Sequence, residues 1–451
     1  MPFICLLQAN KYHSLPCRHI VSLAKIKTMY WQKRTPDERM ARIQQALTEN
    51  VNFSTDASLG YPASRLDSRV FYEEAPFLRD APVLQTYVAN PNHIGCHTMG
   101  TSEKAFGGTQ ALEREVLDIV GVDIFKAIPD SLDGYISPGG TEANIQALWM
   151  YRNYFMHEHH ALPHQIAIMA SEDTHYSIAK GANLLQLEWI CTPVERDHRT
   201  LIPEQIAQLI ADAMQRGIKY LIVVGNMGTT MFGSVDDVAV YTSLLDHYKM
   251  HYKMHIDGAY GGFVHPFSQA DHSLTFLNPA ISSVTIDAHK MLQAPYGTGI
   301  FLCRKNLIHH VMTQEAAYVE GMDVTLCGSR SGANAVAVWM ILATYGPHGW
   351  YEKISILQMR TQFLCRELAL VGVRFFRNPS MNIVTIDASF ISTELAEKYT
   401  LVPQTHTPDN RWYKIVVMDH VEIEHLHTFI QDLKAALYAE KGLSAAIYSS
   451  T

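Results

Sequence analysis

Between residues 134 and 303 the sequence alternates between short apolar runs and longer stretches with helical periodicity. The expected strands are 134–136, 165–170, 187–191, 220–225, 253–257, 283–286 and 299–303, and the expected helices are 141–155, 176–183, 203–216 and 238–248. Strands that are joined through helices run parallel with right-handed crossovers, so helices cover both faces of the sheet. The pattern predicts an α/β fold with a mainly parallel, seven-stranded sheet, and ligands of such sheets bind where the strands end.

Beyond about residue 335 the pattern changes to long helices and a few short strands. The helices are expected at 336–345, 350–370 and 423–439, and the strands at 371–376, 382–386 and 413–417. A chain of 451 residues exceeds what one core usually supports. We therefore expect an N-terminal segment (36–78), a large domain (79–335) and a small C-terminal α+β domain (336–451).

The first 36 residues carry six basic side chains and no acidic one. A targeting presequence is one interpretation of this pattern. We favour a basic arm over residues 1–35, which is either disordered or an over-long gene start with Met29 as the working start. The folded part would begin near Pro36, because the sequence Thr-Pro-Asp-Glu at 35–38 is typical of a helix start.

Composition narrows the class of protein. Hydrophobic residues make up 47% of the chain, charged residues 18%, and the formal net charge is −8, which does not favour nucleic acid as a partner. The seven cysteines are odd in number and form no C-x-x-C pair, which indicates reduced thiols in the cytoplasm. No apolar run reaches the roughly 18 residues that span a bilayer, so we expect a soluble cytoplasmic protein that binds no membrane.

A glycine-containing turn joins the first expected strand to the helix that follows. In the sequence Ser-Pro-Gly-Gly-Thr-Glu-Ala-Asn at 137–144, Gly139 and Gly140 let backbone N–H groups approach an anion. The start of the helix also favours negative charge. The motif therefore predicts a phosphate cradle, and the alternative is a plain turn that Thr141 caps.

Two further polar residues follow expected strands. Asp257 ends an apolar strand, and a buried carboxylate there needs a cationic partner, such as a protonated pyridine nitrogen. The alternative is an aspartate that caps a turn. His175 follows another strand and could stack flat on an aromatic ring, or it could be a structural histidine with its hydrogen bonds satisfied.

Lys290 follows His289 at the end of the strand near 286. A lysine nucleophile must be neutral, whereas a free lysine has a pKa of about 10.4, so the chemistry needs burial or a neighbouring cation. His289 is such a neighbour. The alternative is an ordinary surface lysine.

In this order, these motifs resemble the group II amino-acid decarboxylases that depend on pyridoxal phosphate, which have the aspartate aminotransferase-like fold type I. The most specific pieces are 139–144, 255–262, 287–291 and 328–332. The segments 59–62, 173–177, 228–230 and 235–237 resemble bacterial histidine and plant serine decarboxylases, whereas 141–148, 285–291, 329–332 and 381–384 resemble archaeal tyrosine/aspartate decarboxylases. The substrate therefore stays open between these branches.

The resemblance implies a role for each matching residue. Lys290 would bind the cofactor covalently, His175 would stack on its ring, and Asp257 would pair with the pyridine nitrogen above the small Ala259. The phosphate would be held by Gly139, Gly140 and Thr141, with Asp287 and His289 nearby.

Three further matches concern the loops and the neighbouring subunit. Asn226 stands where relatives often have a threonine, which leaves the contact to the cofactor's 3-oxygen open. Tyr318 would return a proton to the substrate carbon, and the alternative is a surface tyrosine. Gly328 and Ser329, with Arg330, would reach the phosphate of the neighbouring subunit, which implies a homodimer with shared active sites.

The expected reaction is α-decarboxylation of an L-amino acid to the amine and carbon dioxide. The side chains expected over the pocket include no clear basic clamp, which favours an aromatic or imidazole substrate; they are Tyr61, Ser64, His93 and His97. An inward-pointing Arg65 would instead favour an acidic substrate. The alternatives are a carbon–carbon lyase of the sphingosine-phosphate lyase type and a cofactor-binding protein without turnover.

No metal site is expected. The run His-Glu-His-His at 157–160 lacks the histidine that H-E-x-x-H requires at Ala161. Ser177 and Lys180 match S-x-x-K, but no K-T-G partner is present.

Overall fold

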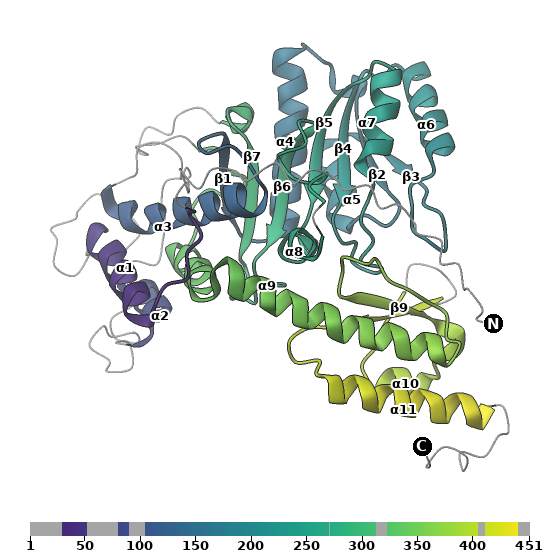
Figure 1. The fold of residues 1–451 in the computed structure, drawn as a ribbon. Helices are drawn as coiled ribbons and strands as arrows, with labels where there is room; N and C mark the ends of the chain where they lie inside the picture. The colour runs from purple at the N-terminus through teal and green to yellow at the C-terminus, as the bar shows by residue number, and fades with distance from the viewer. Residues whose placement is uncertain are drawn as a thin grey trace, which may run out of the picture.

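The computed structural model describes residues 29–51, 80–89, 104–269, 271–312, 323–404 and 411–440. Its centre is a seven-stranded sheet in the order β1-β7-β6-β5-β4-β2-β3 (Figure 1). The strands are β1 (Leu132–Ser137), β2 (Ile166–Ser171), β3 (Glu188–Thr192), β4 (Tyr220–Asn226), β5 (His251–Asp257), β6 (Ile281–Asp287) and β7 (Gly299–Arg304). β7 runs opposite in direction to the other six strands, so the predicted mainly parallel sheet of seven strands is confirmed.

Helices cover both faces of this sheet, as the alternation of elements predicts. The helices α4 (Gly140–Glu158) and α5 (Tyr176–Leu185) share one core, and α3 (Gly107–Asp118), α6 (Pro203–Gln215) and α7 (Val238–His247) share the other. Alternate residues of β2 divide between the two: Ile166 and Ile168 pack toward α4, and Ala167 and Met169 pack toward the opposite layer. Every residue of β2 is buried, as expected for a central parallel strand.

A long helix, α9 (Gly332–Leu370), connects the large sheet to the C-terminal part. It is interrupted at Gly346, whose φ of 61° is left-handed, and Pro347 follows. The predicted helices 336–345 and 350–370 are the two halves of α9. Trp339 and Trp350 pack into the large core, whereas Leu364 belongs to a separate core of the C-terminal part.

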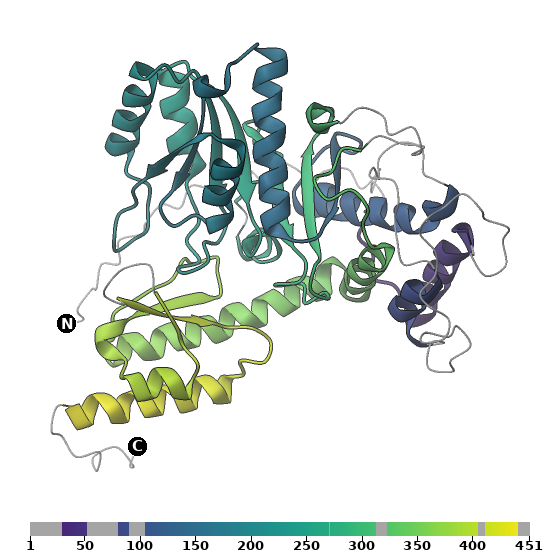
Figure 2. The same ribbon diagram turned by 180° about the vertical axis from the view of Figure 1, so that it is seen from behind.

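The C-terminal part is a small antiparallel sheet beneath the large one, with helices on one side (Figures 1 and 2). Its elements are β8 (Phe375–Phe376), β9 (Ile383–Asp387), α10 (Thr393–Lys398), β10 (Val402–Pro403), β11 (Trp412–Val416) and α11 (Ile423–Glu440). The predicted strand 371–376 is wrong except for its last two residues, because Gly372 takes a φ of 71° and reverses the chain after α9. The predicted division of the chain at residue 335 stays a prediction.

The N-terminal helices α1 (Pro36–Glu49) and α2 (Pro82–Ala89) lie beside α3 and the start of α9 (Figure 1). Packing begins before Pro36, earlier than the sequence predicts. Trp31 is only 2% exposed, and its indole N–H donates to the carbonyl oxygen of Leu342 at 2.7 Å. The predicted disordered arm over residues 1–35 is therefore wrong for residues 31–35, which belong to the packed structure. Residues 1–28 lie outside the described part of the chain.

The remaining helical elements are short. They are α8 (His265–Ser268), a π-helical turn at Ile119–Ile124, and 3₁₀ turns at Lys104–Phe106, Pro163–Gln165, Gly261–Phe263, Leu307–Val311 and Ala388–Phe390. Across the described ranges, no helix has the length and apolar character to cross a membrane.

Candidate active site

A pocket opens at the carboxyl ends of the parallel strands. Its lining residues follow β2, β4, β5 and β6, and they are His175, Asn226, Gly228, Thr229, Thr230, Asp257, Ala259, Tyr260 and Lys290. The sheet thus brings together three predicted residues that are far apart in the sequence, namely His175, Asp257 and Lys290. This is the edge at which an open parallel sheet binds its ligand.

Asp257, the last residue of β5, is a buried carboxylate with 6% exposure. Its Oδ2 accepts from Nδ2 of Asn144 at 2.8 Å, and its Oδ1 accepts from the backbone N–H of Ala259 at 3.1 Å. Both donors are neutral, and no lysine or arginine of the described chain forms an ion pair with Asp257. A buried carboxylate of this kind calls for a positive partner, and a protonated ring nitrogen in the pocket would be one.

His175 stands at the start of α5 and caps it. Its Nδ1 accepts from the backbone N–H of Ser177 at 3.3 Å and lies 2.8 Å from the hydroxyl of the same residue. Burial lowers the pKa of His175, and the nearby Asp257 offsets only part of that shift. The ring is therefore neutral near pH 7, with Nδ1 as an acceptor and the proton on Nε2.

Lys290 follows β6 and forms an ion pair with Asp287, with 2.8 Å between Nζ and Oδ2. Nδ1 of the neighbouring His289 donates to the carbonyl oxygen of Thr298 at 2.8 Å, and its Nε2 lies 3.7 Å from the same Oδ2 of Asp287. The closest charged partner of Lys290 is thus Asp287 and not His289, the neighbour expected from the sequence. The second oxygen of Asp287, Oδ1, is buried without a hydrogen-bond partner in the described chain.

The predicted phosphate cradle lies at the first turn of α4, with Thr141 half-buried in that turn. Gly139 precedes the helix with a φ of +153°, a conformation that side chains rarely adopt. A Cβ on Gly140 would lie 2.8 Å from Oδ2 of Asp287 and 3.2 Å from Cβ of Ala259. Backbone N–H groups at a helix start, free of side chains, fit a phosphate.

Asn226 lines the pocket, but its amide is already bonded within the protein. Its Nδ2 donates to Asp236 at 2.8 Å and to Ser171 at 3.1 Å, and its Oδ1 accepts from the hydroxyl of Thr174 at 2.9 Å. Both amide hydrogens are therefore used, which leaves no donor for a cofactor oxygen. The side chain fixes the ends of β2 and β4 relative to each other.

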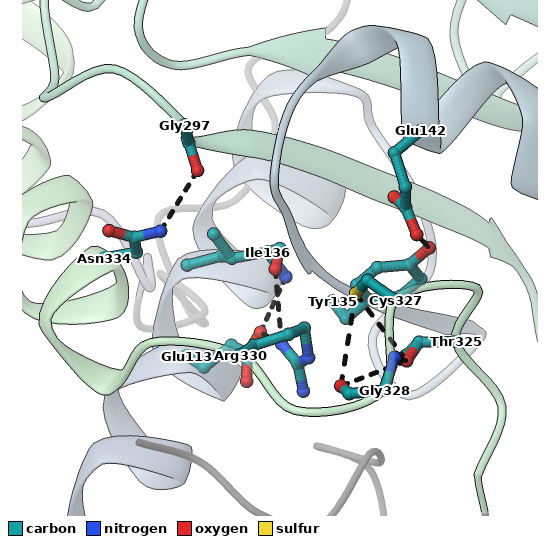
Figure 3. Close-up of polar contacts among 10 residues, drawn as sticks. All are labelled: Glu113, Tyr135, Ile136, Glu142, Gly297, Thr325, Cys327, Gly328, Arg330 and Asn334. Carbon is teal, nitrogen blue, oxygen red and sulfur yellow. Dashed lines mark hydrogen bonds and ion pairs between the residues drawn. The ribbon is translucent and has the colours of Figure 1, made fainter. Parts of the chain in front are cut away.

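Gly328 and Ser329 are not among the residues that line this pocket, and Gly328 lies beside Thr325 and Cys327 (Figure 3). The N–H of Gly328 donates to the hydroxyl of Thr325 at 3.1 Å, and Ser329 is exposed. Arg330 forms a buried ion pair with Glu113 of the same chain, and its expected contact to a neighbouring subunit stays a prediction.

Sequence reasoning assigned no role to three buried residues that support the pocket, Asn144, Ser177 and His255. Asn144 is the last residue of the glycine motif, and it faces Asp257 from the second turn of α4. Five predicted residues lie outside the described part of the chain, and they are Tyr61, Ser64, His93, His97 and Tyr318; the same holds for Arg65.

The fold and the pocket together define a class of protein. A mainly parallel sheet with a lysine, a buried carboxylate and a glycine cradle at its ligand edge is the arrangement of a fold-type-I protein that binds pyridoxal phosphate.

Comparison with known proteins identifies the family. Residues 93–375 match the model of the pyridoxal-dependent decarboxylase conserved domain. The chain is 48% identical to the tryptophan decarboxylase of Clostridium sporogenes, over 90% of this chain and 97% of that relative. It is 31% identical to a probable L-tyrosine/L-aspartate decarboxylase of Methanocella arvoryzae, over 80% of this chain and 95% of that relative. The solved L-methionine decarboxylase from Streptomyces sp. 590 has the same fold, with a TM-score of 0.67 and 20% identity over 88% of this chain and 93% of that one.

The chain belongs to the pyridoxal-dependent decarboxylase family, as the resemblance predicts. It is an amino-acid decarboxylase, its fold is type I, and its cofactor is pyridoxal phosphate.

The cradle gives a first testable prediction. A Gly140→Ala methyl group would push the Asp287 carboxylate away from Lys290, so we expect the affinity of the apoenzyme for pyridoxal phosphate to fall roughly tenfold, equivalent to about 1.4 kcal/mol. Fluorescence titration measures this affinity. Gly349→Ala is the matched control, because its Cβ would meet only Tyr345 atoms at 3.7 and 3.8 Å. Equal affinities of the two variants would contradict the cradle.

Proposed function

We propose that this decarboxylase acts on an aromatic L-amino acid, with tryptophan as the preferred substrate. The observation that carries the assignment of a cofactor-bound reaction is the buried Asp257, which has only neutral partners and lies in one pocket with Lys290. The proposed preference for tryptophan as the substrate is supported by the 48% identity to a tryptophan decarboxylase, which extends over nearly the whole of both chains.

In this proposal the first turn of α4 holds the cofactor's phosphate. The backbone N–H groups near Gly140 and Thr141 donate to it, and the helix dipole adds to the attraction. A carboxylate offers no hydrogen to a phosphate. Asp287 therefore acts indirectly, by holding Lys290, and His289 closes the cradle from beside Gly139.

The ring would lie between His175 and Ala259. Pyridoxal phosphate, when bound, supplies an electron sink for the pair of electrons left behind by carbon dioxide. Asp257 would keep the ring nitrogen protonated, since no lysine or arginine of the described ranges forms an ion pair with it. The small methyl group of Ala259 leaves room for a flat ring.

Lys290, whose amine lines the pocket, would hold the cofactor covalently. His175 holds a proton on Nε2, and this proton or the hydroxyl proton of Tyr318 returns to the substrate carbon after carbon dioxide has left. Gly328 and Ser329 would contribute to the site of a second copy, which makes the enzyme a homodimer. We also place it in the cytoplasm, where its described cysteines, which are all free thiols, would stay reduced.

The experiment that tests the proposed function is a substrate panel. Purified holoenzyme is incubated with tryptophan, tyrosine, phenylalanine, histidine, aspartate and glutamate, and carbon dioxide and the amine are measured. We expect release from tryptophan at a higher kcat/KM than from the other five. Release from aspartate or glutamate alone would contradict the aromatic assignment, and no release from any amino acid would contradict decarboxylation.

A further inference from the structure

A row of buried side chains behind the pocket connects Asp257 to His175 through Asn144. The amide nitrogen of Asn144 lies 2.8 Å from Oδ2 of Asp257 and 2.9 Å from Oγ of Ser177. Its amide oxygen lies 3.0 Å from Nε2 of His255. Asn144 is 1% exposed, and Ser177 and His255 are fully buried, so water does not compete for these hydrogen bonds.

Asp257 determines the direction of the hydrogen bonds in this row. An ionised carboxylate only accepts, so Asn144 must turn its NH₂ group toward Asp257 and its oxygen toward His255. Nε2 of His255 must then donate, either to Asn144 alone or also to the hydroxyl of Thr285 at 3.2 Å. Burial lowers the pKa of His255 to about 4, so the ring is neutral and its Nδ1 accepts.

The row continues beyond His255 in the same direction. Nδ1 of His255 lies 2.7 Å from Oγ of Ser283, which must donate its single hydrogen there. Ser283 in turn accepts from the hydroxyl of Tyr151, which is fully buried in the core around α4. Every member from Tyr151 to Asp257 therefore has one arrangement of its hydrogens.

The other branch reaches His175. Ser177 accepts from Asn144, so its own hydroxyl hydrogen is available for Nδ1 of His175, 2.8 Å away. The backbone N–H of Ser177 donates to the same nitrogen. Two donors on Nδ1 leave the proton of His175 on Nε2. Among the described residues, the charged groups that face His175 are Asp257, Lys290, Asp287 and Lys180, and the one that faces His255 is Asp257.

We propose that Asn144 and His255 are positioning residues that couple the two sides of the active site, holding Asp257 as an acceptor and His175 as the Nε2–H tautomer. The inference rests on the proposed roles of Asp257 and His175. The NH₂ group of Asn144 donates to both Asp257 and Ser177. If the amide rotated by 180°, its oxygen would face Asp257 and Ser177 would lose its donor. Replacing His255 would therefore disturb both Asp257 and His175, although His255 contacts neither of them.

The test replaces His255 in two ways. His255→Phe keeps a ring but has no donor, whereas His255→Gln restores a donor and an acceptor at similar reach. His265→Phe is the matched control, because His265 is another buried histidine, 3% exposed, with Nδ1 2.8 Å from the hydroxyl of Ser380. The readouts are kcat, the affinity of the apoenzyme for pyridoxal phosphate, the pH at which the absorbance of the bound cofactor changes, and Tm.

We expect His255→Phe to lower kcat roughly 10- to 100-fold, the range for losing a partner that orients an active group. It should also weaken cofactor binding and move the pH of the absorbance change, and His255→Gln should recover most of each loss. His265→Phe should lower Tm alone. A His255→Phe variant that behaves like His265→Phe would overturn the proposal.

A second variant covers the case in which His255→Phe does not fold. Asn144→Asp keeps the shape of the side chain but presents an acceptor to Asp257, so the absorbance change should move in pH; an unmoved pH response would overturn the proposal. Cofactor affinity and absorbance do not need turnover. A wild-type protein that binds pyridoxal phosphate without releasing carbon dioxide would therefore contradict the proposed function while this test still gives a result.

Discussion

Lys290→Ala is expected to abolish the visible absorbance band of the bound cofactor and to reduce carbon dioxide release by at least about 10³-fold. Nζ of Lys290 is the amine that lines the pocket, where it lies 2.8 Å from Asp287 at the end of β6. Without it, pyridoxal phosphate can bind only through its phosphate and ring. An absorbance spectrum of the dialysed protein and a carbon dioxide assay with tryptophan measure both effects.

Lys253→Ala is the matched control for this variant. Lys253 lies on β5 near the opposite end of the sheet, where its ammonium group sits 4.2 Å from the ring centre of Tyr154, and burial lowers its pKa. It therefore tests whether losing a half-buried lysine is enough to disturb the enzyme. A visible band that persists in Lys290→Ala, or one that is also lost in Lys253→Ala, would refute the assignment of Lys290.

Asp257→Asn is expected to lower kcat about 10²- to 10³-fold, the range for losing one group that stabilises developing charge in a buried site. The side chain keeps its shape, but a neutral amide cannot hold the ring nitrogen in its protonated form. The electrons released with carbon dioxide then have a weaker acceptor. Steady-state kinetics with saturating cofactor separate this effect from weaker binding.

Asp133→Asn controls for the removal of a buried negative charge. Asp133 on β1 is 5% exposed, and its Oδ2 accepts from the backbone N–H of Asn306 at 2.6 Å. Burial raises its pKa, as it does for carboxylates in general. We expect the control to change Tm without changing kcat. Equal values of kcat in Asp257→Asn and wild type would contradict the role of Asp257.

The sheet could be predicted from sequence because its signal is local. Strands such as β2 and β4 are short apolar runs between two helices, and every residue of β2 is buried, as such a run implies. The predictions fail where the deciding contact is distant. Trp31 is held by Leu342, more than 300 residues away, and nothing in the basic composition of the first 36 residues points to that contact.

In the candidate site, too, residues with a local sequence signal could be predicted, whereas residues whose role depends on a distant contact could not. Gly139, Asp257 and Lys290 could be proposed as site residues from the sequence because each stands next to a strand end with a recognisable neighbour. Asn144 and His255 could not, because their roles depend on a hydrogen bond across 111 residues of sequence. Asp287 was predicted beside the phosphate, but its ion pair with Lys290 depends on how the chain turns after β6.

The helix α9 limits how far this enzyme can be treated as an assembly of exchangeable modules. A C-terminal unit cut out at residue 336 would take with it Trp339 and Trp350, which fill the core of the other part. The shared helix also fits closely against the N-terminal chain, since a Cβ at Gly346 would lie 2.7 Å from Cβ of Lys33. Recombination between relatives would therefore preserve packing only if the crossover fell after Leu357, where α9 leaves the large core.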